Sequence, residues 1–368
     1  MDKIKGKLGF GYMRLPMIEN EVDIEQAKKM TDLFMASGFN YFDTAHGYID
    51  GKSEKALKVC LVDRYNREDY IVVDKLSGNF FEKEEDLEGL FNETLEACGL
   101  EYFDIYLMHA LSANNIEQYR NCNAIKFALN KKKEGKVKHV GFSFHDTAEV
   151  LDQILTEFPE LEIVQIQLNY LDYEDPLIQS RKCYEVCRKH NKPVIIMEPV
   201  KGGRLVNLPD NAKQIFDELN SGSAASYAIR FAASLEGVVM VLSGMSNMEQ
   251  MEDNISYMKD FKPLSELELQ KVLEVSELCR SQKLIPCTNC RYCVSECAKN
   301  IPIPDLFICL NSKYNHNEWQ SKSFYNELYS NELGKASDCI KCGKCEKICP
   351  QHLNIRDLLL EVKESFEK

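Results

Sequence analysis

The sequence predicts an α/β protein in which a (β/α)8 barrel is followed by a small, mainly helical domain rich in cysteine. Two observations predict this fold class. Short apolar, β-rich runs alternate with amphipathic stretches over residues 8–243, and eight cysteines form two tight groups after residue 286. Because 368 residues exceed what one core usually supports, we expect a barrel domain over residues 1–282 and a second domain over residues 283–368.

Eight segments have the composition of buried strands, and amphipathic segments separate them. The expected strands are 8–13, 39–45, 70–76, 103–109, 137–143, 162–168, 193–199 and 237–243. They do not alternate strictly between apolar and polar residues, which is typical of parallel strands buried on both faces. Segments such as 23–38 and 84–100 have apolar residues at helical spacing and end near glycine. Eight strand–helix repeats are enough to close a TIM barrel, and 246–258 and 265–282 are predicted to be further helices.

Polar or chemically capable side chains occur where each predicted strand ends. They are Asp43, Lys75, His109, Ser143, Asn169, Glu198 and Ser243. In barrels of this kind the active site is built at the carboxyl ends of the strands. The positions of these residues therefore indicate an enzyme.

Both cysteine groups have the spacing CxxCxxCxxxC, which is the spacing of bacterial ferredoxins. The predicted ligands are Cys287, Cys290, Cys293 and Cys297 in the first group and Cys339, Cys342, Cys345 and Cys349 in the second. In such ferredoxins three cysteines of a group bind one [4Fe-4S] cluster and the fourth binds the other cluster. Two clusters are therefore expected: one bound by Cys287, Cys290, Cys293 and Cys349, and the other by Cys339, Cys342, Cys345 and Cys297. Ala298 stands where a proline often follows the fourth cysteine of the motif. This departure weakens the prediction that the fourth cysteines bind the opposite clusters more than the prediction of two clusters. A pair of structural zinc sites is the main alternative.

The barrel segments resemble the aldo-keto reductase family over roughly residues 6–260. FDTAHGY, VDKL and IYLMH match the family's catalytic segments in order, and imply a tetrad of Asp43, Tyr48, Lys75 and His109. With the cysteine-rich segment included, the chain resembles the ferredoxin-fused branch of that family.

The chemistry of carbonyl reduction explains why these residue types occur together. Hydride transfer to a carbonyl carbon builds negative charge on the oxygen, so a proton donor must meet it. A phenol titrates near pH ~10 and is a weak donor until a cation such as Lys75 stabilises its phenolate. Asp43 would hold Lys75 charged and in place, and His109 would orient the substrate through its carbonyl oxygen.

The resemblance also implies positions for a nicotinamide dinucleotide. Those for the nicotinamide and its ribose are Gly11, Tyr12, Met13, Ser143, Gln165 and Met197. Those for the adenosine half are Gly244, Ser246, Gln250 and Asn254. Family members that use NADP carry Lys and Arg where Gly244 and Gln250 stand here, so NAD(H) is favoured over NADP(H). The turn 200–204 either offers N–H groups to a pyrophosphate or is a plain tight turn.

Charge and hydropathy restrict the partners. The net charge of −13 argues against nucleic acid and anionic membrane surfaces. The first residues lack the apolar stretch of a signal peptide, and no apolar run approaches the ~18 residues of a membrane span. We therefore expect a cytoplasmic protein, in which cysteines bind metal more often than they form disulfides.

These observations favour an oxidoreductase that moves a hydride between a nicotinamide and a carbonyl or alcohol substrate, with two [4Fe-4S] clusters that exchange electrons with a redox partner protein. Nicotinamides transfer two electrons at once and the clusters one each, so direct exchange needs an intermediary such as a flavin. Two alternatives remain open. One is an ordinary carbonyl reductase with structural or redox-sensing clusters, and the other is an electron-transfer protein with the barrel as a docking scaffold.

Overall fold

The computed structural model describes residues 3–175, 178–281, 284–314, 321–322, 325–326 and 333–367. The chain divides into two compact units, of which the first comprises Met1–Val200 and Lys213–Val275. The second comprises Lys201–Ala212 and Ser276–Lys368, so a short segment from the middle of the chain packs with the C-terminal residues. The predicted boundary between residues 282 and 283 lies outside the described residues.

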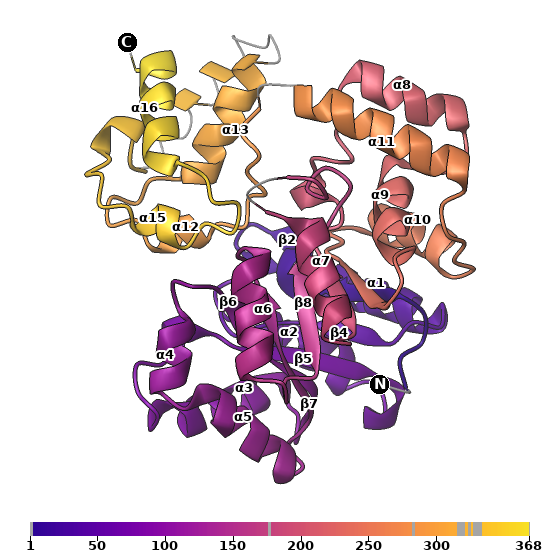
Figure 1. The fold of residues 1–368 in the computed structure, drawn as a ribbon, viewed down its shortest axis with the longest axis vertical. Coiled ribbons are helices and arrows are strands. Elements are labelled where there is room, and N and C mark those ends of the chain that lie inside the picture. Colours follow the sequence, from indigo (N-terminus) through magenta and orange to yellow (C-terminus); the bar gives the residue numbers. More distant parts are fainter. Residues whose placement is uncertain are drawn as a thin grey trace. The chain divides into compact units, whose positions relative to one another are not determined.

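The first unit contains a closed barrel of eight parallel strands, which confirms the predicted fold class (Figure 1). The barrel strands are β1 (Leu8–Gly11), β4 (Tyr41–Asp43), β5 (Ile71–Leu76), β6 (Phe103–Leu111), β7 (Val137–Phe144), β8 (Ile163–Gln167), β9 (Val194–Met197) and β10 (Val238–Ser243). Each overlaps one of the eight predicted segments, and β10 closes the barrel against β1. A small antiparallel hairpin of β2 (Met17–Ile18) and β3 (Glu21–Val22) was not predicted.

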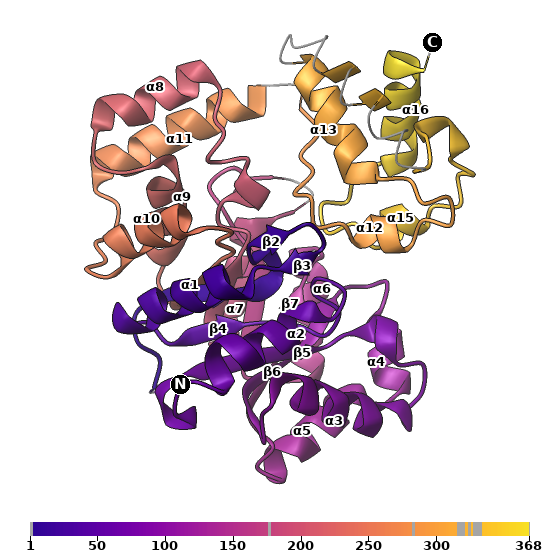
Figure 2. The same ribbon diagram turned by 180° about the vertical axis from the view of Figure 1, so that it is seen from behind.

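Helices surround the barrel strands in both views (Figures 1 and 2). They are α1 (Ile24–Ala36), α2 (Lys52–Leu57), α3 (Asp86–Cys98), α4 (Ile116–Asn121), α5 (Ala124–Lys133), α6 (Ala148–Glu157), α7 (Ser180–Lys189), α9 (Ala224–Ala233) and α10 (Met248–Met258). The chain also contains α8 (Asp210–Leu219) and α11 (Glu266–Ser281). Asp23 caps α1 by accepting the N–H of Gln26 at 3.0 Å, and α3 ends at Gly99 with φ 68°. Nowhere in the described part of the chain does a helix have the length and apolar character to cross a membrane.

Alternate strand residues fill the barrel interior. The apolar residues that pack together there are Tyr41, Ile71, Val73, Ile105, Leu107, Ile163, Ile195, Met240 and Leu242. Side chains two positions apart on a strand face the same way, so the residue two positions after each of these apolar residues also faces inward. Asp43, Lys75 and His109 each follow one of these apolar residues by two positions, as do Gln165 and Met197. The strands therefore point these five side chains inward near their carboxyl ends, beyond the apolar residues.

The second unit consists of short helices around the two cysteine groups. Its helices include α12 (Tyr292–Ser295), α13 (Ile303–Tyr314), α15 (Lys344–Lys347) and α16 (Ile355–Phe366). Apolar residues of α13 and α16 form a small core that also contains Cys293 and Cys345. Domains of this size gain limited stability from their cores and often depend on bound metal.

Candidate functional site

Asp43 and Lys75 form a buried ion pair at the carboxyl ends of the neighbouring strands β4 and β5. Nζ of Lys75 donates to Oδ1 of Asp43 at 2.7 Å and to the carbonyl oxygen of Thr44 at 2.6 Å. The Lys75 side chain is 0% exposed, so water does not compete for these contacts. Burial raises the pKa of Asp43, and the Lys75 ammonium opposes that rise. The pair therefore fixes a cation at the end of the barrel.

Tyr48 lies on the loop between β4 and α2. The loop turns with φ of 91° at Gly47 and 77° at Gly51, which glycine adopts without strain. Nζ of Lys75 lies 4.9 Å from the centroid of the half-buried Tyr48 ring. The same ring meets the His109 ring edge-on at a centroid distance of 5.6 Å. The structure thus brings together all four residues of the tetrad that the resemblance implies.

His109 is oriented by a residue that the sequence analysis missed. The Ser77 hydroxyl and Nδ1 of His109 are hydrogen bonded at 2.5 Å. Burial and then the Lys75 ammonium lower the pKa of His109 well below its usual value, so the ring is neutral near pH ~7. When the Ser77 hydroxyl donates to Nδ1, the ring proton is on Nε2, which can donate to a substrate oxygen. A serine after a strand is too common to signal this role from sequence.

Gln165 and Ser143 present polar atoms where the nicotinamide carboxamide is expected. Oε1 of Gln165 is buried and has no hydrogen-bond partner among the described residues, and Nε2 lies 3.6 Å from Sδ of Met197. Oγ of Ser143 accepts the N–H of Ala110 at 2.7 Å, which leaves its hydroxyl hydrogen to donate. Because an unpaired buried acceptor is costly, an amide donor bound at Gln165 would be favourable. These residues fit a nicotinamide.

The end of β1 is arranged differently from its expected role. The Tyr12 side chain is fully buried, and its hydroxyl is hydrogen bonded to Thr31 of α1 at 2.8 Å. Its ring therefore belongs to the core, and only its backbone is placed to meet a ribose. Gly11 has room for an ordinary side-chain contact, since an added Cβ would lie 3.5 Å from the Ser243 carbonyl oxygen, and Met13 is half-buried.

The segment expected to bind adenosine lies against Arg14, a second residue that the sequence analysis missed. The Ser246 hydroxyl donates to the carbonyl oxygen of Arg14 at 2.8 Å, and a Cβ on Gly244 would lie 3.2 Å from the Arg14 stem. Gln250 uses Oε1 to accept the Ser246 N–H at 2.8 Å, whereas Oδ1 of Asn254 is buried with no hydrogen-bond partner in the described part of the chain. The Arg14 side chain therefore packs against a segment whose own sequence lacks basic residues.

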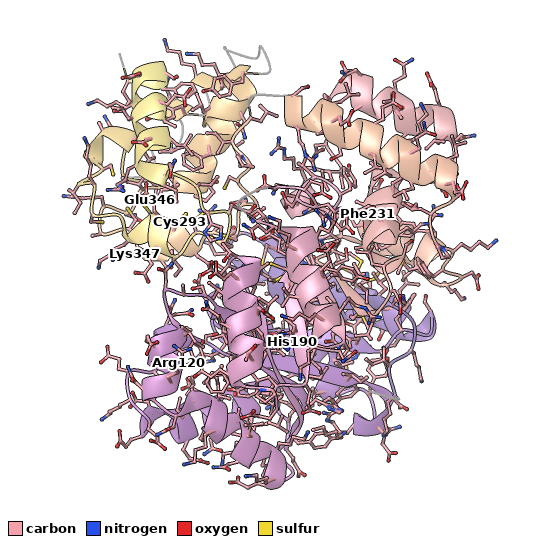
Figure 3. The ribbon with its side chains drawn as sticks, viewed as in Figure 1. Arg120, His190, Phe231, Cys293, Glu346 and Lys347 are labelled. Carbon is pink, nitrogen blue, oxygen red and sulfur yellow. The ribbon has the colours of Figure 1, made fainter. Side chains whose placement is uncertain are left out.

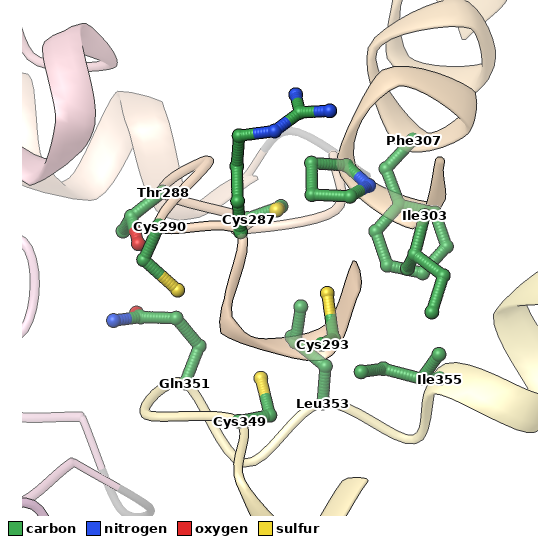
Figure 4. A pocket seen from close by; sticks show the side chains of 12 residues that line it. Cys287, Thr288, Cys290, Cys293, Ile303, Phe307, Cys349, Gln351, Leu353 and Ile355 are labelled. Atoms are coloured by element: carbon green, nitrogen blue, oxygen red, sulfur yellow. The ribbon is translucent and has the colours of Figure 1, made fainter. Parts of the chain in front are cut away.

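Four cysteines from both groups line one pocket of the second unit, and their sulfur atoms point into it (Figure 4). They are Cys287, Cys290, Cys293 and Cys349. Burial and then the neighbouring thiols of Cys290 and Cys287 raise the pKa of Cys293. Thiolates gathered this closely need a bound cation to compensate their charge.

The remaining four cysteines of the two groups line a second pocket. They are Cys297, Cys339, Cys342 and Cys345. Of the eight cysteines, all of which the structure describes, only Cys342 is exposed. The second pocket is therefore the more open to solvent at its ligands.

The spacing of the cysteine sulfur atoms can be compared with the spacing that a single zinc ion requires. Tetrahedral zinc with Zn–S bonds of about 2.3 Å needs sulfurs about 3.8 Å apart. Among the described residues, the only group of three such ligand atoms within 4.8 Å of one another is Glu54, Asp74 and Cys98 of the barrel. No three sulfur atoms of the eight cysteines, all of which the structure describes, lie within 4.8 Å of one another. Burial and then the neighbouring Glu54 carboxyl raise the pKa of Asp74 well above its usual value.

The first pocket has a buried lysine nearby. Nζ of Lys201 donates to Oε1 of Gln351 at 2.9 Å, and the two residues are 2% and 4% exposed. Gly202, at φ 64°, packs so tightly that a Cβ would clash with the Thr288 carbonyl oxygen. Gln351 and Thr288 both line the first pocket. The turn 200–204, for which contact with a pyrophosphate and a plain tight turn were both open, thus contributes Lys201 and Gly202 to the surroundings of the cysteines in the second unit.

Comparison with known proteins identifies the barrel. The family model for the aldo/keto reductase family matches residues 7–277. This chain belongs to the aldo/keto reductase family. Its relatives include L-galactose dehydrogenase of Arabidopsis thaliana, which is 25% identical over 278 residues that cover 70% of this chain and 85% of the relative. The chain is accordingly an NAD(P)-dependent oxidoreductase of the aldo/keto reductase type.

Solved structures of other aldo/keto reductases have the same fold. One from Klebsiella pneumoniae, in complex with NADPH, has a TM-score of 0.59 at 18% identity, covering 73% of this chain and 90% of that chain. The holo form of one from Bacillus halodurans has a TM-score of 0.60 at 22% identity, covering 73% of this chain and 91% of that chain. At these identities the likeness establishes the fold alone.

The second unit of this aldo/keto reductase matches a different family. The model for a 4Fe-4S dicluster domain matches residues 286–353, a range that contains both cysteine groups. The match implies two [4Fe-4S] clusters, which confirms the predicted ferredoxin-like domain. A dicluster ferredoxin domain is therefore attached to a barrel enzyme.

Proposed function

We propose that this aldo/keto reductase transfers a hydride between a nicotinamide dinucleotide and a carbonyl or alcohol carbon of a small molecule in the cytoplasm, and that its two clusters exchange electrons with a partner protein. The observation that carries the enzymatic part is the buried Lys75 ammonium, which Asp43 holds 4.9 Å from the Tyr48 ring centroid. A buried cation beside a phenol favours transfer of the phenolic proton.

The tetrad residues have separate roles in this proposal. The bound nicotinamide supplies or accepts the hydride. Tyr48 gives its hydroxyl proton to the substrate oxygen as that oxygen gains negative charge, and Lys75 stabilises the phenolate that remains. Neutral His109 donates a hydrogen bond from Nε2 to the same oxygen, which orients the carbonyl carbon. Asp43 keeps Lys75 in position.

The nucleotide would be held at both ends by residues of the first unit. Ser143 and Gln165 would bind the carboxamide, and Arg14 would bind a phosphate of the dinucleotide. The expected preference for NAD is not supported, since the Klebsiella relative was solved with NADPH and Arg14 supplies a cation that the sequence analysis did not place there. We therefore include NADP(H) as a cofactor on equal terms.

A pair of titrations tests the role of Arg14. A charge-assisted hydrogen bond contributes about 1.5–3 kcal/mol, so Arg14→Gln should weaken NADPH binding by about tenfold to a hundredfold. Arg14→Lys retains the charge and should lose less. Equal affinities of the wild type and Arg14→Gln for both NADH and NADPH would exclude Arg14 from the nucleotide site.

For the clusters, we propose one bound by Cys287, Cys290, Cys293 and Cys349 and the other by Cys339, Cys342, Cys345 and Cys297. The two pockets support this assignment because each contains one of these sets. Anaerobically purified protein should contain about eight irons per chain. Bound zinc without iron would refute the assignment.

Mutation of an exposed ligand separates this function from its alternatives. Under the proposed function, Cys342→Ser should slow electron exchange with a partner while NADPH-dependent reduction of a test aldehyde continues. Aldehyde reduction that continues in the variant, with no electron exchange in the wild type, would favour structural or sensing clusters. Reversible cluster reduction without turnover of any carbonyl would favour an electron-transfer protein with the barrel as a scaffold.

A further inference from the structure

The second pocket is bordered by exposed lysines. Lys341, Lys344 and Lys347 alternate with its cysteines along the chain, and Lys299 lines the pocket itself. All four side chains belong to exposed residues of the second unit. We call these four residues the lysine face. Figure 3 labels Lys347 at the end of α15.

Two acidic residues near the lysine face have partners within the second unit, and Glu296, which lines the second pocket, is a third acidic residue there. Glu346 forms an ion pair with Arg356 at 2.7 Å. The Asp338 carboxylate accepts the backbone N–H of Lys335 at 2.8 Å and caps the short helix that begins there. The lysine face is therefore a locally positive surface on a chain whose net charge is −13.

The two pockets differ in the number of basic residues around their cysteines. Between Cys287 and Cys297 the sequence contains no lysine, and its one arginine, Arg291, pairs with Asp305 at 3.0 Å. The second pocket instead combines the exposed Cys342 with Ile340, which is 59% exposed. An apolar centre surrounded by charge is typical of protein docking surfaces, and small contacts of this kind suit transient electron-transfer complexes.

We propose that the lysine face is the docking surface for a small acidic protein that carries one electron at a time. The proposal rests on the proposed function in one respect, the presence of the second cluster. The reduced carrier loses one electron and is oxidised, and the second cluster gains that electron and is reduced, with no proton or bond transferred. Cys342 marks the point of entry because it is the exposed ligand.

Electrostatics determine how large the effect should be. Oppositely charged surfaces raise association rates by about 10- to 1000-fold, and salt removes the gain. The Debye length is about 8 Å at an ionic strength of 0.15 M, so charges next to Cys342 act on a docked carrier more strongly than charges several Debye lengths away. Position, and not only net charge, should therefore control the rate.

Charge reversal at matched positions tests this. The test variant is Lys341→Glu/Lys344→Glu/Lys347→Glu. The control variant is Lys126→Glu/Lys182→Glu/Lys259→Glu, which changes the net charge equally at exposed barrel positions. The probe is a reduced, acidic plant-type [2Fe-2S] ferredoxin, mixed anaerobically with the full-length holoprotein in a stopped-flow instrument. Bleaching of the [4Fe-4S] absorbance gives the second-order rate constant at several salt concentrations.

The wild-type rate constant should fall as salt increases. At low salt the test variant should react at least tenfold more slowly than the wild type and depend less on salt, whereas the control variant should stay within about threefold. A Lys→Gln version of the test variant should be intermediate. Equal losses in test and control variants, or a wild-type rate that rises with salt, would overturn the proposal.

Two further measurements keep this result distinct from failure of the proposed function. Iron content and the rate of reduction by dithionite show whether each variant retains both clusters. A holoprotein with both clusters that reduces no aldehyde would refute the hydride chemistry and leave the docking test decisive. A wild type without iron would refute the docking proposal together with the cluster assignment.

Discussion

Replacing Tyr48 with Phe removes the hydroxyl that we propose as the proton donor and keeps the aromatic ring. The Tyr48 ring contacts Lys75, with Nζ 4.9 Å from its centroid, and the His109 ring at 5.6 Å. Phenylalanine can keep both ring contacts, so the buried Lys75–Asp43 pair remains covered. Only the proton donor is lost. General acid catalysis contributes about 10²- to 10⁴-fold, which corresponds to about 3–5 kcal/mol of transition-state stabilisation.

The assay follows NADPH oxidation with a test aldehyde, and a parallel titration measures NADPH binding. Tyr48→Phe should lower kcat by at least a hundredfold and leave the NADPH dissociation constant within about threefold. Tyr102→Phe is the control, since Tyr102 directly precedes β6 and so lies at the opposite end of the barrel. A Tyr48→Phe enzyme with more than a tenth of the wild-type kcat would show that another group protonates the substrate.

Three further changes test other parts of the structure. The pKa of His109 is lowered in the folded chain, so below about pH 6.5 the unfolded chain binds a proton at His109 that the folded chain does not bind. The free energy of unfolding of the wild type should therefore decrease relative to that of His109→Gln as the pH falls below about 6.5. Above pH ~6.5 the two proteins should show the same pH dependence. Thermal unfolding at several pH values measures this, and parallel curves would contradict it. Lys201→Gln removes a buried cation near the first pocket. Because reduction adds negative charge to a cluster, loss of this cation should lower the reduction potential of one cluster. Unchanged potentials in an EPR-monitored redox titration would exclude the effect. Cys342→Ser should lower the bound iron from about eight to about four per chain. The control is Cys187→Ser, a change at a buried cysteine of α7, which should retain all of the iron. Equal iron content in the two variants would argue against the ligand assignment.

The barrel could be predicted because its signal is local. A buried parallel strand is a short apolar run, and β5 (Ile71–Leu76) falls within the predicted segment 70–76. The hairpin of β2 (Met17–Ile18) and β3 (Glu21–Val22) could not be predicted, since two-residue strands contain no periodicity. Asp43 and Lys75 were predicted as candidates because strand ends of a barrel converge, and their parity on β4 and β5 places both side chains inside.

Residues that depend on barrel closure were missed. Arg14 lies three residues after the end of β1, whereas Gly244 and Ser246 follow β10, more than 200 positions later. The two segments meet only because β10 pairs with β1, with Phe10 opposite Ser243. The preference for NAD counted the basic residues of the adenosine segment alone, whereas in the proposed function Arg14 from a second segment also contributes to the nucleotide site.

Lys201 shows the same limit for the second unit. It lies in the sequence between β9 and α8, where the neighbouring residues indicate a barrel loop, yet its ammonium contacts Gln351, two positions after the ligand candidate Cys349. Cysteine spacing predicts which thiols can bind a cluster, because the ligands themselves are close in sequence. It does not predict the charges around that cluster, which depend on tertiary packing and influence its reduction potential. The two pockets have nearly identical cysteine motifs but different cations, a buried Lys201 near the first and the exposed lysine face around the second. Under the proposed cluster assignment, we therefore expect the two clusters to differ in reduction potential and in accessibility, although their cysteine motifs are nearly the same.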